Sequence, residues 1–229
     1  MTIDFSTSAL LAIDVQNDFC PAYTAVSGEK RPEGALAVSK GDAVIGPLNT
    51  LGERFVQSGG RLIATQDWHP QGHVSFASAH RGKQAGDTLD LPGVPDQILW
   101  PDHAVQGSLG ACFHERFTLN RVSLILRKGF RPGLDSYSAF FENDRKTPTG
   151  LDGFLRGLAI KTLVVGGLAT DYCVLYSVLD AVRLGYTTLV LADGIRGVGY
   201  PEGSVERAFK AMEDAGISLV DSKEIRGTL

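Results

Sequence analysis

One cysteine, Cys173, lies where a β-branched apolar run passes through two glycines into a segment with helical spacing of apolar residues. The run covers 162–165, the glycines are Gly166 and Gly167, and the helical pattern covers 171–184. This spacing predicts that Cys173 lies in the first turn of the helix, where unpaired N–H groups and the helix dipole favour an anion. We therefore expect a stabilised thiolate, the form in which cysteine is a nucleophile. The competing interpretation is a buried structural cysteine.

Other chemically active side chains follow three further apolar runs. Asp14 directly follows the first run, while Asp67 and Lys128 each follow a later run by one residue. In open α/β sheets, ligands bind at the carboxyl ends of the strands, so these side chains and Cys173 are predicted to share one rim. Asp14 can accept the thiol proton and Lys128 can hold the thiolate, which is the pattern of acyl transfer by a cysteine nucleophile. The backbone N–H groups of 168–173 are candidates for an oxyanion hole.

A possible metal site lies in the same region. Asp67 and His69 are two residues apart and point the same way on an extended chain, and His103 follows later. Two histidines and one carboxylate leave coordination positions open for water or substrate, which is typical of catalytic sites. His73 and His80 are possible additional ligands, although lone loop histidines are more often solvated.

The elements that position these residues can be read from the apolar pattern. Near-continuous apolar runs alternating with helical segments predict a parallel sheet that is covered on both faces. Helical periodicity is seen in four segments, with Gly185 and Gly216 as expected helix ends. The predicted strands are 9–13, 61–65, 123–126, 162–165, 188–191 and 217–220, and the predicted helices are 42–58, 151–158, 171–184 and 204–215.

Two segments interrupt this alternation. The segment 20–40 is rich in Gly, Pro and Ser, and the segment 70–110 has no sustained periodicity. A structureless stretch of that length inside a compact domain is typically a functional loop or lid. We expect one domain over 1–229 with a long loop carrying the metal site at about 67–110.

Composition narrows the class of protein. The chain has 229 residues, 43% of them hydrophobic, and a net charge of −4, which provides no basic surface for nucleic acid or anionic lipid. Its three cysteines contain no C-x-x-C pair and predict no disulfide framework. No signal peptide is recognisable at the N-terminus, and no apolar run approaches the ~20 residues that span a membrane. These features predict a cytoplasmic protein that binds neither nucleic acid nor membrane.

Five motifs together resemble the isochorismatase-like cysteine hydrolase family, and within it the nicotinamidases (pyrazinamidases). The motifs are AIDVQNDF at 12–19, QDWHP at 66–70, WPDH at 100–103, RKG at 127–129 and GLATDYCV at 167–174. The resemblance covers about residues 8 to 200 in matching order. It implies a three-layer α/β/α fold with a six-stranded, mainly parallel sheet. It also implies hydrolysis of nicotinamide to nicotinate and ammonia in NAD salvage, with a side activity on pyrazinamide.

The resemblance also implies roles for individual residues. Cys173 is the expected nucleophile, Asp14 the general base and acid, and Lys128 the partner of the thiolate. In this family the Leu168–Ala169 peptide bond is typically cis, and the N–H groups of Ala169 and Cys173 form the oxyanion hole.

A metal and a ring-binding pocket are implied in the same way. Asp67, His69 and His103 resemble the ligands of one divalent metal ion, most often Zn²⁺ but also Fe²⁺ or Mn²⁺, whose role is to bind the pyridine nitrogen. Phe19 and Trp100 resemble the aromatic walls that hold the ring, and Tyr137 is a further candidate. The nicotinamide substrate is then the small-molecule partner, and the family relation implies a homo-oligomer.

Two alternatives stay open at the level of sequence. One is a metal-free relative, such as an isochorismatase or a carbamoyl-amide hydrolase, which lacks the Asp-x-His and His ligands. The other is a binding or regulatory protein built on the same fold, because a fold does not determine a function.

Overall fold

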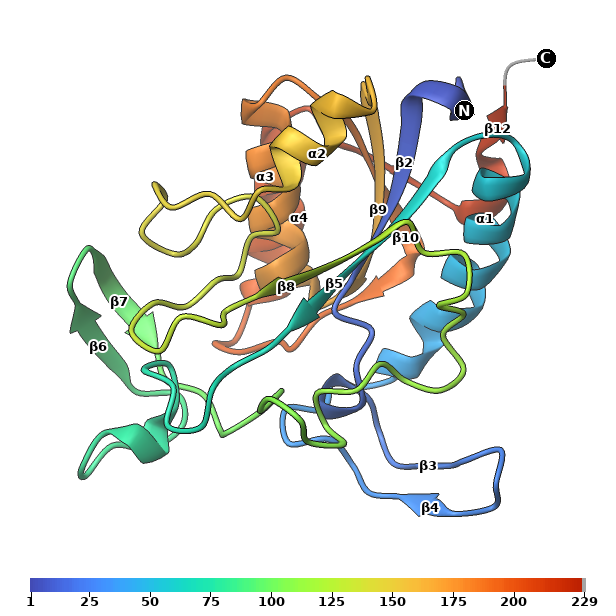
Figure 1. The fold of residues 1–229 in the computed structure, drawn as a ribbon. Helices are drawn as coiled ribbons and strands as arrows, with labels where there is room; N and C mark the ends of the chain where they lie inside the picture. The colour runs from blue at the N-terminus through green and yellow to red at the C-terminus, as the bar shows by residue number, and fades with distance from the viewer. Residues whose placement is uncertain (228–229) are drawn as a thin grey trace.

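A six-stranded parallel sheet forms the centre of the computed structural model, which describes residues 1–227 (Figure 1). The strand order is β11-β10-β9-β2-β5-β8, and every pair of neighbours runs parallel. This confirms the predicted sheet. The strands are β2 (Ser8–Ile13), β5 (Arg61–Asp67), β8 (Leu124–Lys128), β9 (Thr162–Leu168), β10 (Thr187–Arg196) and β11 (Ser218–Val220).

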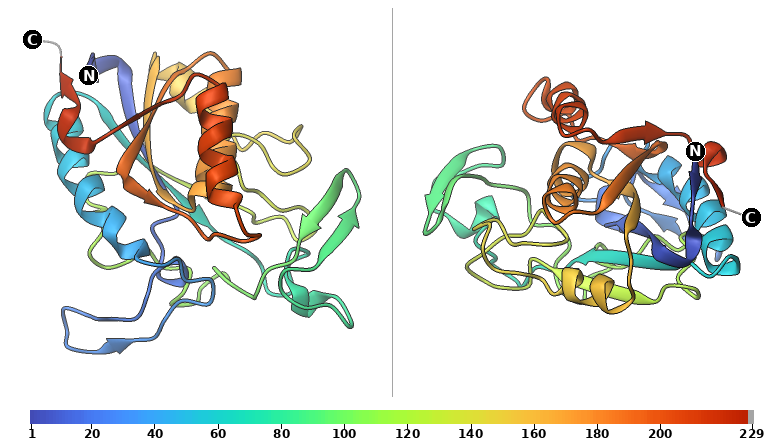
Figure 2. Two further views of the ribbon diagram at one scale, coloured as in Figure 1. Left: turned by 180° about the vertical axis from the view of Figure 1, so that it is seen from behind. Right: turned by 90° about the horizontal axis from the view of Figure 1, so that it is seen from above.

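Helices cover both faces of this sheet, as the views in Figures 1 and 2 show. Helix α1 packs on one face, and α2, α3 and α4 lie on the other. The result is the expected three-layer α/β/α arrangement. The helices are α1 (Ile45–Gln57), α2 (Leu151–Gly157), α3 (Leu175–Arg183) and α4 (Ser204–Asp214).

Alternate residues of each central strand serve the two layers. In β2, Leu10 and Ala12 belong to the apolar cluster that contains α1, whereas Leu11 and Ile13 belong to the cluster that contains α2, α3 and α4. Both faces of the strand are therefore buried, which is why its sequence is a continuous apolar run rather than an alternating one.

The order of the strands reverses direction between β2 and β9. From β2 the chain adds β5 and then β8 on one side of the sheet, and it returns to add β9, β10 and β11 on the other side. Such a reversal leaves a crevice at the carboxyl ends of the two central strands, where α/β proteins bind their ligands. Asp14 follows β2 and Ala169 follows β9, so the predicted catalytic residues flank this crevice.

The segment 70–110 contains more regular structure than its sequence indicated. It forms an antiparallel hairpin of β6 (Thr88–Leu91) and β7 (Val94–Ile98), which projects from the body of the molecule in Figure 1. The expectation of a structureless loop was therefore wrong here. Strand β6 alternates over only four residues, and β7, which contains Pro95, does not alternate, so the pattern around the turn Pro92–Gly93 cannot be distinguished from a polar loop.

The remaining elements are short. One pair of two-residue strands, β3 (Tyr23–Thr24) and β4 (Lys30–Arg31), lies within 20–40, and another, β1 (Thr2–Ile3) and β12 (Arg226–Gly227), joins segments near the two ends of the chain. Single 3₁₀ turns are formed by Phe5–Thr7, Asn17–Phe19, Gly41–Val44, Ala77–Ala79 and Ser222–Glu224. Over residues 1–227, none of the helices has the length and apolar character needed to cross a membrane.

Candidate active site

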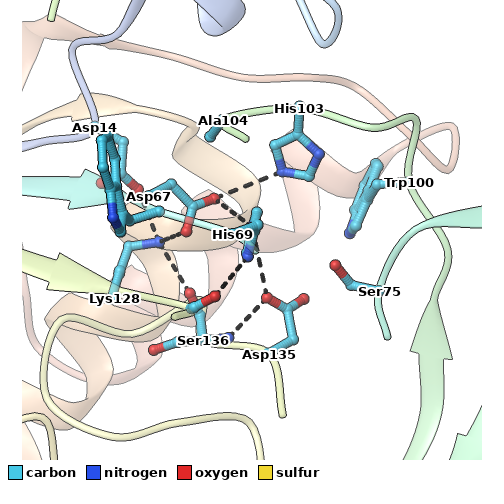
Figure 3. A network of polar contacts seen from close by, with 12 residues as sticks. Asp14, Asp67, His69, Ser75, Trp100, His103, Ala104, Lys128, Asp135 and Ser136 are labelled. Carbon is cyan, nitrogen blue, oxygen red and sulfur yellow. Dashed lines mark hydrogen bonds and ion pairs between the residues drawn. The ribbon is translucent and has the colours of Figure 1, made fainter. Parts of the chain in front are cut away.

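The ammonium group of Lys128 is at the centre of the site (Figure 3). Its Nζ lies 2.9 Å from Asp14 Oδ2 and 3.1 Å from Asp67 Oδ1. It also donates to the Ser136 carbonyl at 2.9 Å and to Cys173 Sγ at 3.4 Å. The last residues of β8 and β5, Lys128 and Asp67, are direct neighbours in the sheet, which explains their proximity. The four side chains predicted to share a rim are thus in contact through one cation.

Burial and charge set the protonation of this lysine. Removal from water would lower the pKa of Lys128, but the carboxylates of Asp14 and Asp67 raise it well above its usual range. Lys128 is fully buried, so its positive charge is offset by carboxylates at short range and little by solvent. The site therefore contains a permanent cation next to the sulfur.

Asp14 is held in one orientation by its neighbours. Its backbone has a φ of 46°, and its N–H donates to Thr65 Oγ1 at 3.1 Å while that hydroxyl donates to Asp14 Oδ1 at 2.6 Å. This leaves Oδ2 directed at Lys128. Burial raises the pKa of Asp14, against the opposing effect of the lysine. A buried carboxylate with a raised pKa is a suitable general base and acid.

Cys173 lies in a π-helical turn, Thr170–Val174, that precedes α3, and not in the first turn of a regular α-helix. Burial raises the pKa of the Cys173 thiol well above its usual range, and the attraction of Lys128 only opposes this effect. The regular α-helical start expected from the sequence was therefore wrong. Burial favours the neutral thiol over the expected thiolate, and a thiol must lose its proton before sulfur can attack. The nearby Asp14 carboxylate is the group available to remove it.

Asp67, His69 and His103 bring three metal-binding atoms within 4.8 Å of one another. His69 Nε2 lies 3.0 Å and His103 Nε2 lies 3.5 Å from the same atom, Asp67 Oδ2. The Nδ1 atoms of these rings lie 2.8 Å from the Gly129 carbonyl and 2.7 Å from the Pro101 carbonyl. Because a carbonyl only accepts, each Nδ1 carries a proton, and Nε2 is the atom left to bind a metal.

The electrostatics of this group favour an added positive charge. Burial alone would lower the pKa of His69, but the Asp67 carboxylate raises it to about 9. Without another cation, a proton would therefore occupy Nε2, where a divalent metal would otherwise bind. The donor set of two imidazole nitrogens and one carboxylate fits a divalent metal ion with open coordination positions.

Gly129 permits the close contact between β8 and His69. Its φ is 64°, and a Cβ built at this position would lie only 2.4 Å from His69 Cε1. The glycine of the RKG motif thus allows its own carbonyl to approach His69 Nδ1.

His73 and His80 lie in different surroundings. His73 stacks on His69 with ring centres 4.3 Å apart, and it forms a second group of candidate ligands with His69 and Asp135. However, its Nε2 lies 3.0 Å from the Arg131 carbonyl, and its Nδ1 lies 2.8 Å from Ser75 Oγ. Both nitrogens are thus engaged within the protein. His80 Nε2 lies 2.8 Å from the Val74 carbonyl, outside the group formed by Asp67, His69 and His103.

A cavity beside Cys173 and the metal-binding group has mainly aromatic and aliphatic walls. Phe19, Trp100 and Tyr137 all line it, as predicted. Trp100 Nε1 donates to Tyr137 Oη at 2.9 Å, and Trp100 meets Tyr172 edge to face with ring centres 4.8 Å apart. A mainly apolar cavity with a few polar groups in its lining is suited to an aromatic ring that carries a polar substituent.

Four further residues line this cavity without having been singled out in the sequence: Leu36, Asp135, Tyr172 and Val198. Asp135 lies seven residues after Lys128 in a segment without periodicity, and Leu36 lies in the long loop 20–40. Tyr172 directly precedes Cys173 within a recognised motif. Of the four residues, it is the one whose position in the sequence could have indicated that it lines the cavity.

The turn before Cys173 is tied to the segment 198–204. The Leu168–Ala169 peptide bond is cis, as the resemblance implies. The Asp171 carboxylate accepts the N–H groups of Val198 and Gly199, both at 2.9 Å, and the hydroxyl of Ser204 at 2.5 Å. These bonds hold the cavity residue Val198 close to the turn that carries Cys173.

Comparisons with known proteins agree with this geometry. The isochorismatase domain family matches residues 8–224. A nicotinamidase of Escherichia coli is 44% identical over 96% of this chain and 98% of its own length. The structure of a nicotinamidase–pyrazinamidase of Acinetobacter baumanii is 41% identical, has a TM-score of 0.86, and is matched over 96% of this chain and 98% of its own. A pyrazinamidase of Pyrococcus horikoshii in complex with zinc is 32% identical, with a TM-score of 0.72 and matches over 94% and 99%. The chain belongs to the isochorismatase family of hydrolases.

Proposed function

We propose that this protein is a metal-dependent nicotinamidase, which hydrolyses nicotinamide to nicotinate and ammonia and so serves NAD salvage. The observation that carries this proposal is the position of Cys173, Lys128 and Asp14 beside a metal-binding group, with an aromatic-walled cavity between them. Hydrolysis of a ring amide needs both the cavity with its metal-binding group and the Cys173 sulfur, because the ring must be held in place while the sulfur attacks the amide carbon. Pyrazinamide has the same carboxamide on a related ring and is the expected second substrate.

The substrate ring lies between Phe19 and Trp100 in this proposal, with Tyr137 completing the aromatic wall. Asp67, His69 and His103 would hold the divalent metal, which supplies a Lewis-acidic position for the pyridine nitrogen. The zinc complex of the Pyrococcus horikoshii pyrazinamidase makes Zn²⁺ our first choice. Iron and manganese suit the same donor set.

Formation of the acyl-enzyme begins with proton transfer from the Cys173 thiol to Asp14. The sulfur forms a bond to the amide carbon, and the carbonyl oxygen takes up the negative charge. The N–H groups of Ala169 and Cys173 are the proposed donors to this oxyanion. Asp14 then protonates the amide nitrogen, the C–N bond breaks, and ammonia leaves behind a thioester. Lys128 keeps a positive charge beside the sulfur throughout.

Hydrolysis of the thioester reverses these roles. Asp14 takes a proton from water, and the oxygen of that water forms a bond to the thioester carbon. The C–S bond then breaks, the proton held by Asp14 returns to Cys173, and nicotinic acid is released and gives up its carboxyl proton to the solvent as nicotinate. One water is consumed for each nicotinamide, and the proton transfers to and from sulfur, the amide nitrogen and water all pass through Asp14.

The proposal is tested by measuring ammonia release from nicotinamide. We expect release by the wild-type protein and none by Cys173→Ala, with an unchanged circular dichroism spectrum. Because a thioester cannot form without Cys173, turnover in this variant would rule out the proposed mechanism.

The metal-free alternative is tested separately. We expect about one divalent metal ion for each chain, loss of activity with a chelator, and recovery when metal is added back. Activity that survives complete removal of the metal would favour a metal-free amide hydrolase of the same family.

The homo-oligomer and the cytoplasmic location expected from the sequence remain predictions. Size-exclusion chromatography with light scattering tests the oligomeric state.

A further inference from the structure

Two side-chain amides, those of Gln97 and Asn143, bind each other behind the ring cavity. Asn143 Nδ2 donates to Gln97 Oε1 at 3.0 Å. Gln97 belongs to β7, in the hairpin that projects from the body of the molecule (Figure 1), yet it is only 3% exposed. A fully buried amide in a ribbon with exposed neighbours such as Asp96 indicates that its side chain has specific partners.

Two of those partners are residues of the cavity wall, and a further partner is the backbone carbonyl of Ile98, which Gln97 Nε2 contacts at 2.9 Å. Gln97 Nε2 donates to Asp135 Oδ2 at 3.0 Å and lies 3.1 Å from Tyr137 Oη. Asn143 Oδ1 accepts the backbone N–H of Tyr137 at 2.9 Å. The backbone N–H of Asn143 donates to the backbone carbonyl of Asp135 at 2.8 Å. Asp135 and Tyr137 are therefore held from behind by the same amide pair.

The orientation of the Gln97 amide follows from its partners. A carboxylate oxygen only accepts, so the atom that faces Asp135 is the NH₂ group. The opposite atom faces the NH₂ group of Asn143 and is the carbonyl oxygen. A flipped amide would place oxygen against carboxylate, so the network has a single consistent arrangement.

The segment that directly follows this hairpin supplies another wall of the cavity. Trp100 follows Gln97 by three residues and donates its indole N–H to Tyr137 Oη at 2.9 Å. Neither Gln97 nor Asn143 lines the ring cavity, and both instead line a neighbouring cavity that shares Tyr137 and Tyr172 with it. They act on the ring site only through the residues that they hold.

We propose that Gln97, together with Asn143, is a positioning residue that sets the affinity of the site for the substrate ring by fixing Tyr137 and Asp135. This inference rests on the proposed nicotinamidase function. The aromatic walls hold the ring both before and during the reaction, so their displacement weakens ground-state and transition-state binding alike. Such a change raises KM and leaves kcat nearly constant. None of the three residues Asp14, Lys128 and Cys173 is bonded to either amide.

The test uses the metal-loaded enzyme and the variants Gln97→Met, Asn143→Leu and their combination. We expect each single variant to raise KM for nicotinamide by about tenfold and to change kcat by less than about threefold. Because the two amides act as a unit, the double variant should raise KM little more than either single variant does. Calorimetric titration of the metal-loaded protein with nicotinate should show the same loss of affinity, without any turnover.

The matched control is Gln84→Met, which makes the same substitution at an exposed position before β6 and should leave KM unchanged.

Unchanged KM in both Gln97→Met and Asn143→Leu would overturn the proposal, as would a fall in kcat as large as the rise in KM. Multiplicative effects in the double variant would also contradict it. If Gln97→Met does not fold, the half-buried Asn143→Leu decides alone. Absence of turnover in the wild-type enzyme would instead reject the proposed function.

Discussion

At the scale of single residues, Lys128 joins parts of the site that come from distant points in the chain. Its one charge is shared between Asp14 and Asp67, and its remaining contacts are the Ser136 carbonyl and Cys173 Sγ. Without the ammonium group, two buried carboxylates would face each other with no cation between them. Lys128 therefore contributes to both the folding and the chemistry of the site.

Replacing Lys128 by Met should lower both activity and stability. Removing one partner of a buried ion pair costs about 3–5 kcal/mol. Loss of the charge beside the sulfur should reduce kcat by about 10³-fold, as for the loss of one preorganised charge-stabilising group. Urea unfolding and ammonia release measure the two effects. A variant with near-normal turnover would show that the charge has no role in catalysis.

His114 is a buried group outside the site, and its lowered pKa predicts that stability depends on pH. Its Nδ1 accepts the Arg116 N–H at 3.2 Å, and within residues 1–227 its Nε2 has no hydrogen-bond partner. Burial lowers the pKa of His114, so the unfolded chain, with an ordinary value near 6.5, takes up the proton first as the pH falls. Its contribution to stability is complete above about pH 6.5 and is lost as the pH falls through the lower folded-state pKa.

We therefore predict that the free energy of unfolding falls less steeply below pH 6.5 in His114→Gln than in the wild-type protein. Urea titrations at half-unit steps between pH 5 and pH 8 give the two curves. Parallel curves for the two proteins would show that His114 does not contribute to the pH dependence.

At the scale of elements, the ends of parallel strands place the site. Asp67 and Lys128 are the last residues of β5 and β8, while Asp14 and the turn that carries Cys173 follow β2 and β9. The connection after β8 adds a tight constraint. Gly129 turns there with a positive φ, and its carbonyl lies against the imidazole of His69, a proposed metal ligand.

Replacing Gly129 by Ala should weaken metal binding. The new methyl group would meet the His69 ring at a separation that ordinary atoms do not reach, so the ring must move. Loss of an outer partner of a ligand histidine typically costs about 10–100-fold in metal affinity. Competition with a chromogenic zinc chelator measures this affinity. Gly133→Ala, in the same loop but with open space around its Cβ, is the control that should bind normally.

Elements differed in how well their sequences predicted them. The four inner strands were recognisable because both of their faces are buried, and the partly exposed edge strands β8 and β11 because each keeps a short apolar run. Strands β5 and β8 continue two residues further than predicted, to Asp67 and Lys128. The hairpin of β6 and β7 was missed because its short strands depend on a tertiary contact, the burial of Gln97. The π-helical turn at Cys173 was missed as well, since apolar spacing over five residues does not distinguish it from an α-helical turn.

At the scale of the whole molecule, the sequence predicted which residues meet but not how they are charged. The fold brings Asp14, Lys128 and Cys173 together as expected, and it does the same for Asp67, His69 and His103. The raised pKa of Cys173 depends on burial from every side, which a local motif does not report. Asp135 was missed for a similar reason, because only tertiary structure brings it to the cavity.

Metal binding should stabilise the whole fold. A ligand that binds only the folded state, at 100 times its Kd, adds about 2.7 kcal/mol to the free energy of unfolding. We therefore expect added zinc to raise Tm in the wild-type protein and not in His103→Ala, which lacks one of the three ligands. Differential scanning calorimetry with and without chelator makes the comparison. Equal metal-induced shifts in both proteins would place the binding site elsewhere.

The reversal of strand order between β2 and β9 has a practical consequence. Every residue of the site up to Tyr137 comes before Leu158, while Ala169 and Cys173 come after it, and Leu158 lies on the surface between α2 and β9. Two polypeptides divided there would carry the base and the nucleophile separately, so each should be inert. Fused to a pair of interacting proteins, they should regain ammonia release when those proteins associate. We therefore expect a chain divided at Leu158 to act as a split reporter that releases ammonia when its two parts are brought together.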